Sequence, residues 1–411
     1  MKKIILILGL VFSTSLLAQV SDVPVKFDGQ IRIRGEVDAR DFDNDTDTNT
    51  YTLSRIRFGA RMAPHEDVDV YVQLQDSRAF GTETNTLASS ANIDLHQGYV
   101  QVRNFLGKPI SIKVGRQEML YANQRLIGPV GFSNVGRSFD GVKLTFGKQK
   151  TFDVFATIIK EGNTAVTGPA TPASTAGQEN TDYNFWGLYY KYRHNPKYEL
   201  DGYFLFESDE NEVVPGEDNL KRATLGFYSK GQLSERFDFE SEAAVQFGNR
   251  RGQDVSALML TGSVGYTFPS VRKYVVRVGY DFLSGMDAAD EDYKVFDTLF
   301  ATNHKFYGFM DYFINIPVNT AGQGLQDFMV KGRIPLSDVW QLDAHFHNFR
   351  AAKGEEKNFG TELDLVLNYA YNSAVSFQFA LAFFDPGDLM EARFQNSDFG
   401  VWSYTTLLVG F

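Results

Sequence analysis

Arginine side chains carry the clearest potential for chemistry in this sequence. Seven cations in the first third of the chain lie in the early predicted strands on what would be the inner face: Arg32, Arg34, Arg55, Arg57, Arg61, Arg103 and Lys113. A guanidinium group binds a carboxylate through two parallel hydrogen bonds, and a cluster of such groups lowers the barrier for an anion in a channel. These cations either bind anions or pair with nearby carboxylates and hold a wall together, and the residues alone leave both interpretations open.

Other clusters favour simpler interpretations. The segment 41–47 (DFDNDTD) lacks the glycine and the final glutamate of a calcium-binding loop, so we expect a solvated loop there and also at 287–292 (DAADED). His345 and His347 share a strand face with Asp343, but no serine motif accompanies them. The chain has no cysteine, which excludes disulfides and thiolate sites. We therefore expect no enzyme activity, no cofactor and no metal site.

Hydrophobic and polar residues alternate over much of the chain. Segments 31–38, 67–75, 237–247, 340–347 and 362–369 are examples. A period of two is typical of a β-strand, whose successive side chains point to opposite faces. Such segments recur from residue 25 to the C-terminus, and we expect about eighteen strands, an even number as in bacterial outer-membrane barrels.

The connections between these segments are of two kinds. Short ones at 64–66, 104–109, 147–148, 194–196, 230–235 and 335–338 alternate with long polar ones at 38–50, 162–181, 207–219 and 284–297. This is the plan of an all-β transmembrane barrel with short periplasmic turns and long extracellular loops. The low-complexity stretch 162–177 is either a flexible loop or a plug, and its small polar residues favour the loop.

Soluble β-sandwiches and β-helices also alternate, and the period does not say which face is outside. Three features favour a membrane. The strands are longer than the usual five or six residues. Aromatic residues lie near strand ends, as at Tyr99, Phe282 and Trp402. The chain ends in a strand whose last residue is Phe411, which resembles the signal read by the barrel-assembly machinery.

If the apolar face meets lipid, the polar face must line the lumen. A lysine or arginine on the lipid face costs about 2–4 kcal/mol at the midplane. The cations of the early strands then point inward, and so do the carboxylates of later strands: Asp238, Glu240, Glu242, Asp343, Glu362 and Asp364, with Arg277 as an exception.

The N-terminus predicts a signal peptide at residues 1–18, followed by a single barrel at 19–411. Lys2 and Lys3 precede an apolar run, which ends in Ala18. The net charge of -11 becomes about -13 once both lysines are removed, and such an acidic chain is a poor nucleic-acid binder.

Seven short motifs follow one another along the chain. They are 115–118 (GRQE), 125–128 (RLIG), 136–142 (GRSFDGV), 302–308 (TNHKFYG), 324–327 (GLQD), 345–350 (HFHNFR) and 360–365 (GTELDL). This ordered set resembles the alginate-export family of outer-membrane β-barrel porins. The resemblance covers residues 30–411.

The resemblance implies an eighteen-stranded monomeric barrel in the bacterial outer membrane, in contact with lipid and lipopolysaccharide. It also implies that an anionic, alginate-like polysaccharide is exported through an arginine-lined constriction. By their place in the motifs, Arg116, Arg125 and Arg137 are the candidates for that constriction. Arg55 and Arg57 follow from their lumen parity.

Two alternatives stay open. Arg116 and Arg137 could form salt bridges, with Glu118 or Asp140 as partners. The channel could also be a general porin, or a porin that takes up small anions or oligosaccharides.

Overall fold

The computed structural model describes residues 23–83, 85–86, 92–162, 181–195, 197–214 and 217–411. The expected signal peptide therefore lies outside the described residues. The strands are β1 (Val25–Ala39), β2 (Asn49–His65), β3 (Val68–Ala79), β4 (Ile93–Val102), β5 (Ile110–Gln117), β6 (Phe139–Gly147), β7 (Lys150–Lys160), β8 (Tyr183–Asn195), β9 (Tyr198–Val214), β10 (Glu217–Gln232), β11 (Phe237–Arg250), β12 (Gln253–Thr267), β13 (Val275–Leu283), β14 (Leu325–Pro335), β15 (Trp340–Arg350), β16 (Asn358–Ala370), β17 (Val375–Pro386) and β18 (Gly400–Gly410). The helices are short: α1 (Ile316–Asn319), α2 (Asp388–Phe394) and the 3-10 turns at Phe105–Gly107 and Asn303–Lys305.

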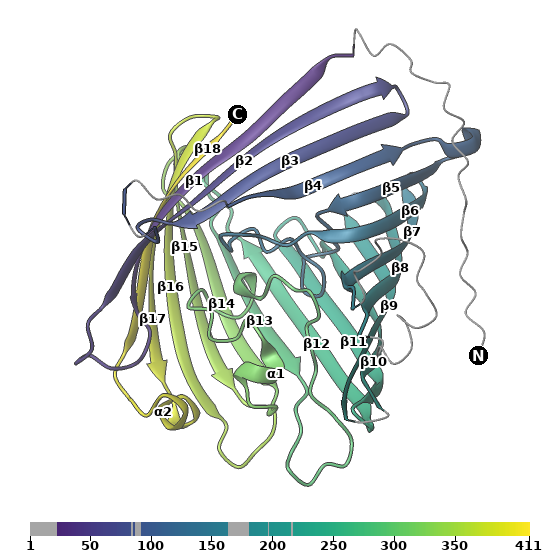
Figure 1. The fold of residues 1–411 in the computed structure, drawn as a ribbon. Coiled ribbons are helices and arrows are strands. Elements are labelled where there is room, and N and C mark those ends of the chain that lie inside the picture. Colours follow the sequence, from purple (N-terminus) through teal and green to yellow (C-terminus); the bar gives the residue numbers. More distant parts are fainter. Residues whose placement is uncertain (1–22, 84, 87–91, 163–180, 196, 215–216) are drawn as a thin grey trace.

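The strands form one closed antiparallel sheet (Figure 1). Each strand pairs with the next along the chain, and β1 pairs with both β2 and β18. Every pairing except that of β1 with β18 joins two strands that are consecutive in the chain, as is usual for antiparallel sheets. The eighteen-stranded barrel predicted from the alternation is confirmed. No helix in the described part of the chain combines the length and the apolarity needed to cross a membrane.

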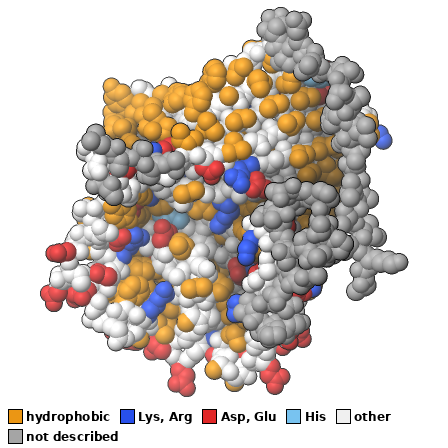
Figure 2. All heavy atoms as spheres, viewed as in Figure 1, with side chains coloured by type: hydrophobic (Ala, Val, Ile, Leu, Met, Phe, Trp, Pro, Cys, Tyr) orange, Lys and Arg blue, Asp and Glu red, His pale blue; other side chains and the backbone are white. Residues whose placement is uncertain are grey.

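The alternation places hydrophobic side chains on the outside of this barrel. Phe58, Val72 and Leu74 are each more than two-fifths exposed, whereas Arg57 and Gln73 on the other face are buried. Figure 2 shows a broad hydrophobic surface over the strands and acidic side chains gathered at the end with the longer loops. An outward apolar band with an inward polar face is the arrangement of an outer-membrane barrel and the reverse of a soluble sandwich.

Most of the expected connections are confirmed, with one exception. β2 and β3, β4 and β5, and β6 and β7 are joined at the predicted short turns, but the loop predicted at 207–219 is wrong. There β9 and β10 continue as a paired ladder, for example Asp209 with Leu220. Of the acidic residues in this segment, Glu217 is exposed, whereas Glu207 is buried and pairs with Arg222 at 2.8 Å. Most of the loop expected at 162–181 lies outside the described residues.

Two long connections fold back into the barrel instead of outward (Figure 1). We call residues 118–138, between β5 and β6, the first inner loop, and residues 284–324, between β13 and β14, the second inner loop. They meet as a short parallel bridge between Ile127 and Phe300. Gly128 N donates to Phe300 O at 2.9 Å, and Phe300 N donates to Leu126 O at 2.9 Å. The sequence predicted only residues 284–297 of the second inner loop and did not predict the first as a loop.

The closing seam between β1 and β18 ends in a close contact. Gly29 N donates to Phe411 O at 2.8 Å, and Phe411 N donates to Gly29 O at 3.1 Å. A Cβ atom at position 29 would lie 2.3 Å from the Phe411 ring. Glycine is therefore needed at position 29 for the last residue of the chain to pack over the first strand.

Candidate functional site

Four arginines project from neighbouring strands of the barrel wall into the lumen. We call Arg32 and Arg34 of β1, with Arg55 and Arg57 of β2, the four-arginine cluster; each is at most 9% exposed. Their inward position follows from strand parity, and Arg32 stands directly opposite Arg55 in the β1–β2 register. The alternation predicted that these four cations point into the lumen, and the structure has them there.

The cluster holds the tip of the first inner loop by its backbone. Arg32 donates to the carbonyl oxygens of Gly131 at 3.0 Å, Phe132 at 2.8 Å and Ser133 at 3.0 Å. Arg55 donates to two of the same oxygens, those of Gly131 at 2.9 Å and Ser133 at 2.8 Å. Carbonyl oxygens are acceptors without formal charge, so these bonds solvate the guanidinium groups and leave their charge in place.

The other two members of the cluster have carboxylate partners. Arg34 pairs with Glu36 at 2.7 Å, and Arg57 pairs with Glu118 at 3.2 Å. Arg34 also donates to Phe132 O at 2.9 Å, and its guanidinium lies 4.0 Å from the centre of the Phe132 ring. Arg34 and Arg57 are therefore neutralised locally, whereas Arg32 and Arg55 form no ion pair within the described residues.

Arg125 joins the first inner loop to the far wall. Its Nη1 donates to an Asp281 carboxylate oxygen at 2.6 Å and to the Tyr307 hydroxyl at 2.9 Å, and its guanidinium stacks 4.0 Å from the centre of the Phe306 ring. Burial alone would lower the pKa of Arg125, but Asp281 and its other partners outweigh burial and raise that pKa. Arg125 therefore stays charged. It links the first inner loop to β13 in a fixed position, and it also borders a lumen cavity.

Arg137 ties the two inner loops together. It donates to the carbonyl oxygens of Gly128 at 3.2 Å and Ala301 at 3.0 Å, and also to that of Phe300. Burial lowers the pKa of Arg137 to about 10, so the side chain remains protonated at neutral pH. The salt bridge considered for Arg137 does not form, because its partners are carbonyl oxygens.

Arg116 lies on the other side of the wall. It forms a bidentate pair with Asp140 at 2.8 and 2.7 Å. In the register, Arg116 aligns with Asp140, and Asp140 aligns with the exposed Ile158, so all three share the outer face. This corrects the expectation that Arg116 lines the constriction. The expected partner Asp140 is present, but the pair is exposed near the loop end of β5 and β6 rather than buried.

The inward carboxylates divide between ion pairs and loop anchors. Asp238 pairs with Arg277, and Asp343 pairs with Arg333 at 3.3 Å. Glu362 accepts a hydrogen bond from Met310 N of the second inner loop at 2.8 Å. The acidic residues therefore neutralise neighbouring cations or hold loop backbone, as the four-arginine cluster also does.

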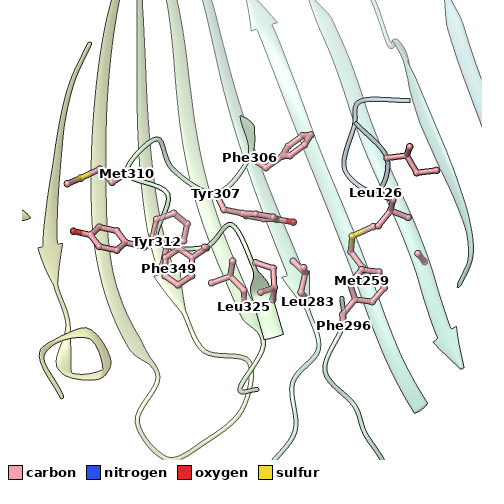
Figure 3. Close-up of a cluster of buried hydrophobic side chains, with 14 of the residues drawn as sticks. Leu126, Met259, Leu283, Phe296, Phe306, Tyr307, Met310, Tyr312, Leu325 and Phe349 are labelled. Carbon is pink, nitrogen blue, oxygen red and sulfur yellow. The ribbon is translucent and has the colours of Figure 1, made fainter. Parts of the chain in front are cut away.

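The inner loops also pack against the wall through hydrophobic side chains (Figure 3). Leu126 of the first inner loop and Met310 and Tyr307 of the second belong to one buried cluster with residues from the strands. Figure 3 shows Met259 and Phe349 on the strands, facing these loop residues. A buried side chain of this size contributes roughly 1.5–3 kcal/mol, so several of them together with the arginine contacts keep the loops inside the barrel.

Two cavities border the tip of the first inner loop. The larger measures about 810 Å³ and the smaller about 600 Å³, and Gly131 and Phe132 line both. The larger cavity is lined by six cations and four carboxylates: Arg125, Lys230, Arg277, Lys305, Lys331 and Arg333 against Glu199, Glu240, Asp281 and Asp343. The smaller is lined by the four-arginine cluster against Glu118. Both linings thus have an excess of positive charge in a chain whose net charge is -11.

Sequence reasoning missed several residues of this site. Asp281 and Lys305 were not singled out, although Asp281 holds Arg125 and Lys305 lines the larger cavity. The inward parity of Asp281 on β13 is a signal that could have found it, two strands beyond the acidic segment of β11. Lys305 lies in an irregular loop, where no periodicity tells which way a side chain points.

Known structures share this fold. A BenF-like porin from Pseudomonas fluorescens superposes with a TM-score of 0.62 at 11% identity, covering 94% of this chain and 98% of that one. OccK8 (OprE) from Pseudomonas aeruginosa gives 0.60 at 13% identity, covering 94% and 97%. OpdK from Pseudomonas aeruginosa, solved with vanillate, gives 0.58 at 12% identity, covering 94% and 98%. At such identities the likeness shows the fold, that of an outer-membrane porin.

Sequence comparison gives the family. No curated protein sequence matches the chain. The family model described as alginate export matches residues 23–398, which is nearly the whole chain. With the closed barrel and the outward apolar band, this places the protein in the bacterial outer membrane as a channel. The chain belongs to the alginate-export family.

Proposed function

We propose that this channel passes carboxylated solutes, and that its main solute is an anionic, alginate-like polysaccharide moving outward. The observation that carries the proposal is the charge of the lumen. Both cavities at the tip of the first inner loop have an excess of cations, although the chain as a whole is strongly acidic. A positive potential inside a low-dielectric wall raises the local concentration of anions and lowers their barrier.

The source of that potential is specific. Arg32 and Arg55 are held by carbonyl oxygens and have no carboxylate partner in the described residues, and Lys305 donates to Asn123 O at 3.0 Å in the same way. Each of these three cations contributes a full charge to the lumen. We assign Arg55 and Arg57 the expected role at the constriction, with Arg125 bordering the larger cavity, whereas Arg137 acts through the loops that it joins.

A second function deserves a test because of the inner loops. They cross the lumen and pack on each other and on the wall, which suits a narrow passage. A narrow cationic passage would equally serve the uptake of small anions or oligosaccharides. The solved structure of OpdK contains vanillate, a small carboxylate, which supports this candidate by analogy of fold alone.

The experiment is ion selectivity and block of single refolded channels in planar bilayers. The reversal potential is measured under a salt gradient, first for the wild type and then for Lys305→Gln, which removes one unpaired lumen cation. Arg116→Gln is the matched control, because it removes one cation from the outer face. We expect anion selectivity that falls in Lys305→Gln and stays unchanged in Arg116→Gln. Equal permeability for anions and cations in the wild type would contradict the proposal.

Block separates the two candidates. Long polyuronate, its short oligomers and a neutral polysaccharide of matched length are added to one side and then to the other. Block by the long polyuronate from the side of the short turns supports export. Block by the short oligomers alone, from either side, favours uptake of small anions. Equal block by the neutral polysaccharide would show that charge is not what the channel reads.

A further inference from the structure

Two histidines and an aspartate lie together on the lumen wall. His345 and His347 point inward from β15, and Asp364 of β16 is the register partner of His345. One ligand atom from each of the three lies within 4.8 Å of the others. His347 and Asp364 are each 1% exposed, whereas His345 lines the larger cavity. The group is therefore buried in the wall on one side and open to the lumen on the other.

The hydrogen bonds around His347 suit a metal ligand. Its Nδ1 is 2.7 Å from a carboxylate oxygen of Asp327, which is itself fully buried. A histidine that binds a metal commonly donates its other ring N–H to a carboxylate, which fixes the tautomer and the ring orientation. Asp327 thus holds His347 with Nδ1–H bound and Nε2 free to accept an ion.

The other two side chains have polar atoms without protein partners. His345 Nδ1 is buried and makes no hydrogen bond. One oxygen of Asp364 accepts from Phe309 N at 3.3 Å, and the other has no protein donor unless Glu362 carries a proton. Buried polar atoms without partners are rare and need an explanation, such as a bound ion.

Charged side chains surround the group. Asp327 and Glu362 are buried beside it, and Lys331, the register partner of His345 on β14, lines the same cavity. The carboxylate behind His347 and the unpartnered atoms of His345 and Asp364 are separate observations that point to a bound ion.

We propose that His345, His347 and Asp364 bind a divalent transition-metal ion, with a fourth position open to the larger cavity. Two imidazoles and one carboxylate form a donor set that Zn²⁺ takes, whereas Ca²⁺ and Mg²⁺ require oxygen ligands throughout. Bonds of about 2.0–2.1 Å place tetrahedral ligand atoms roughly 3.4 Å apart, so ligand atoms now within 4.8 Å of one another approach by at most about 1.4 Å on binding. This inference is independent of the solute proposed above.

The ion would also act on the second inner loop. Asp364 accepts from Phe309 N of that loop, and the Phe309 ring packs edge-on against His345 with centroids 5.2 Å apart. Fixing both side chains around an ion fixes the backbone and ring that they contact. Bound metal therefore stiffens the loop and adds positive charge to the larger cavity.

The test is calorimetric titration of the metal-stripped full-length barrel with ZnCl₂, after purification without a histidine tag. We expect one Zn²⁺ per chain, and a zinc absorption edge with two imidazole ligands. His345→Ala and Asp364→Asn should each weaken binding at least tenfold. Asp327→Asn keeps all three ligands and should weaken binding by about 10- to 100-fold, the effect of losing a carboxylate behind a ligating histidine. His65→Ala, at the exposed end of β2, is the control and should leave affinity unchanged.

Folding of each variant is checked by its heat-dependent mobility in gels, and His345→Gln replaces His345→Ala if the latter does not fold. Absence of stoichiometric Zn²⁺ binding to the folded wild type would overturn the proposal. So would binding that survives in His345→Ala and Asp364→Asn, because the ion would then lie elsewhere. An absorption edge with only oxygen ligands would overturn it as well.

Discussion

The double grip of Arg32 and Arg55 on the first inner loop predicts a non-additive response to mutation. Both side chains donate to the carbonyl oxygens of Gly131 and Ser133. Removing Arg55 alone leaves both oxygens with a donor from Arg32, and the reverse holds as well. Removing both side chains leaves both oxygens without a donor. The two arginines are thus partly redundant clamps on the same two backbone groups.

The magnitudes follow from the bonds. A hydrogen bond from a charged donor contributes about 1.5–3 kcal/mol, but a carbonyl that keeps one donor loses less, so we expect roughly 2 kcal/mol for Arg55→Ala. The double variant Arg32→Ala/Arg55→Ala loses the remaining bonds and should cost more than the sum of the singles, by a coupling of about 0.5–3 kcal/mol. Each 1.4 kcal/mol changes an equilibrium constant tenfold. The fraction of molecules whose loop tip has left the arginines should therefore rise roughly 30-fold in the single variant and more than about 1,000-fold in the double variant.

Hydrogen–deuterium exchange of residues 129–138 measures this unseating. Within the tip, Ser133 N donates to Val130 O at 3.1 Å and Arg137 N donates to Pro129 O at 2.7 Å, so seated amides are protected. Arg333→Ala is the control, because Arg333 lines the larger cavity without contacting this loop. Arg55→Lys keeps the charge but loses the fork geometry, so it should raise exchange while preserving ion selectivity.

The reasoning is refuted if the double variant exchanges at the wild-type rate, or if its effect is the plain sum of the two singles. The first result would mean that hydrophobic packing alone seats the loop. The second would mean that the shared carbonyl oxygens are not a shared constraint. Single-channel conductance gives a second readout, since an unseated tip widens the passage and raises the current.

Three further predictions concern other parts of the barrel. Arg125→Met should cost about 3–5 kcal/mol in urea unfolding from lipid vesicles, because it leaves Asp281 buried and unpaired, and Asp281→Asn in the same chain should restore part of the loss. Burial raises the pKa of Glu118, but its histidine and arginine partners outweigh burial and lower it below the usual 4.5. The contacts of Glu118 therefore stabilise the first inner loop above pH 4.5 and are lost as the pH falls through the lowered pKa. Channel conductance should stay level from about pH 7 to 5 and rise only below about 4.5, and Glu118→Gln should abolish this transition. A rise in conductance near pH 6 would contradict the prediction. Gly29→Leu should reduce the folded fraction, because the leucine side chain enters the space of the Phe411 ring. Heat-dependent gel mobility measures that fraction, and Phe411→Ala in the same chain should restore folding. Equal folding of Gly29→Leu and the wild type would show that the Phe411 ring can move aside.

The strand plan could be predicted because period-two alternation carries the whole barrel. In 31–38 and 67–75, one residue type faces lipid and the other faces the lumen, so the pattern gives both the strand and its direction. The same parity places Arg55 and Arg57 inside. Parity also places Arg116 on the outer face, together with the exposed Val114. For Arg116, parity gives the correct face, whereas the motif that contains this residue led us to expect it in the lumen.

The inner loops could not be predicted in the same way. Their hydrophobic residues, such as Phe306, Met310 and Phe313, follow no period because they fill an irregular space between two loops and the wall. Contacts of Arg137 with loop carbonyls involve backbone atoms, which every residue type carries, so no side-chain pattern announces them. The partners of His347 depend on register between strands, which a sequence without the fold does not reveal.

The seam between β1 and β18 has a consequence for the order in which the molecule is made. Seventeen of the strand pairings join neighbours in the chain, whereas the remaining one joins strands far apart in the sequence, for example at Gln30 and Gly410. β18 is the last of the strands to be synthesised, so one edge of β1 stays unpaired until β18 is present. An open strand edge is prone to aggregation, and contacts between distant residues form slowly. A product that lacks β18 would keep that edge exposed and would therefore be prone to aggregation.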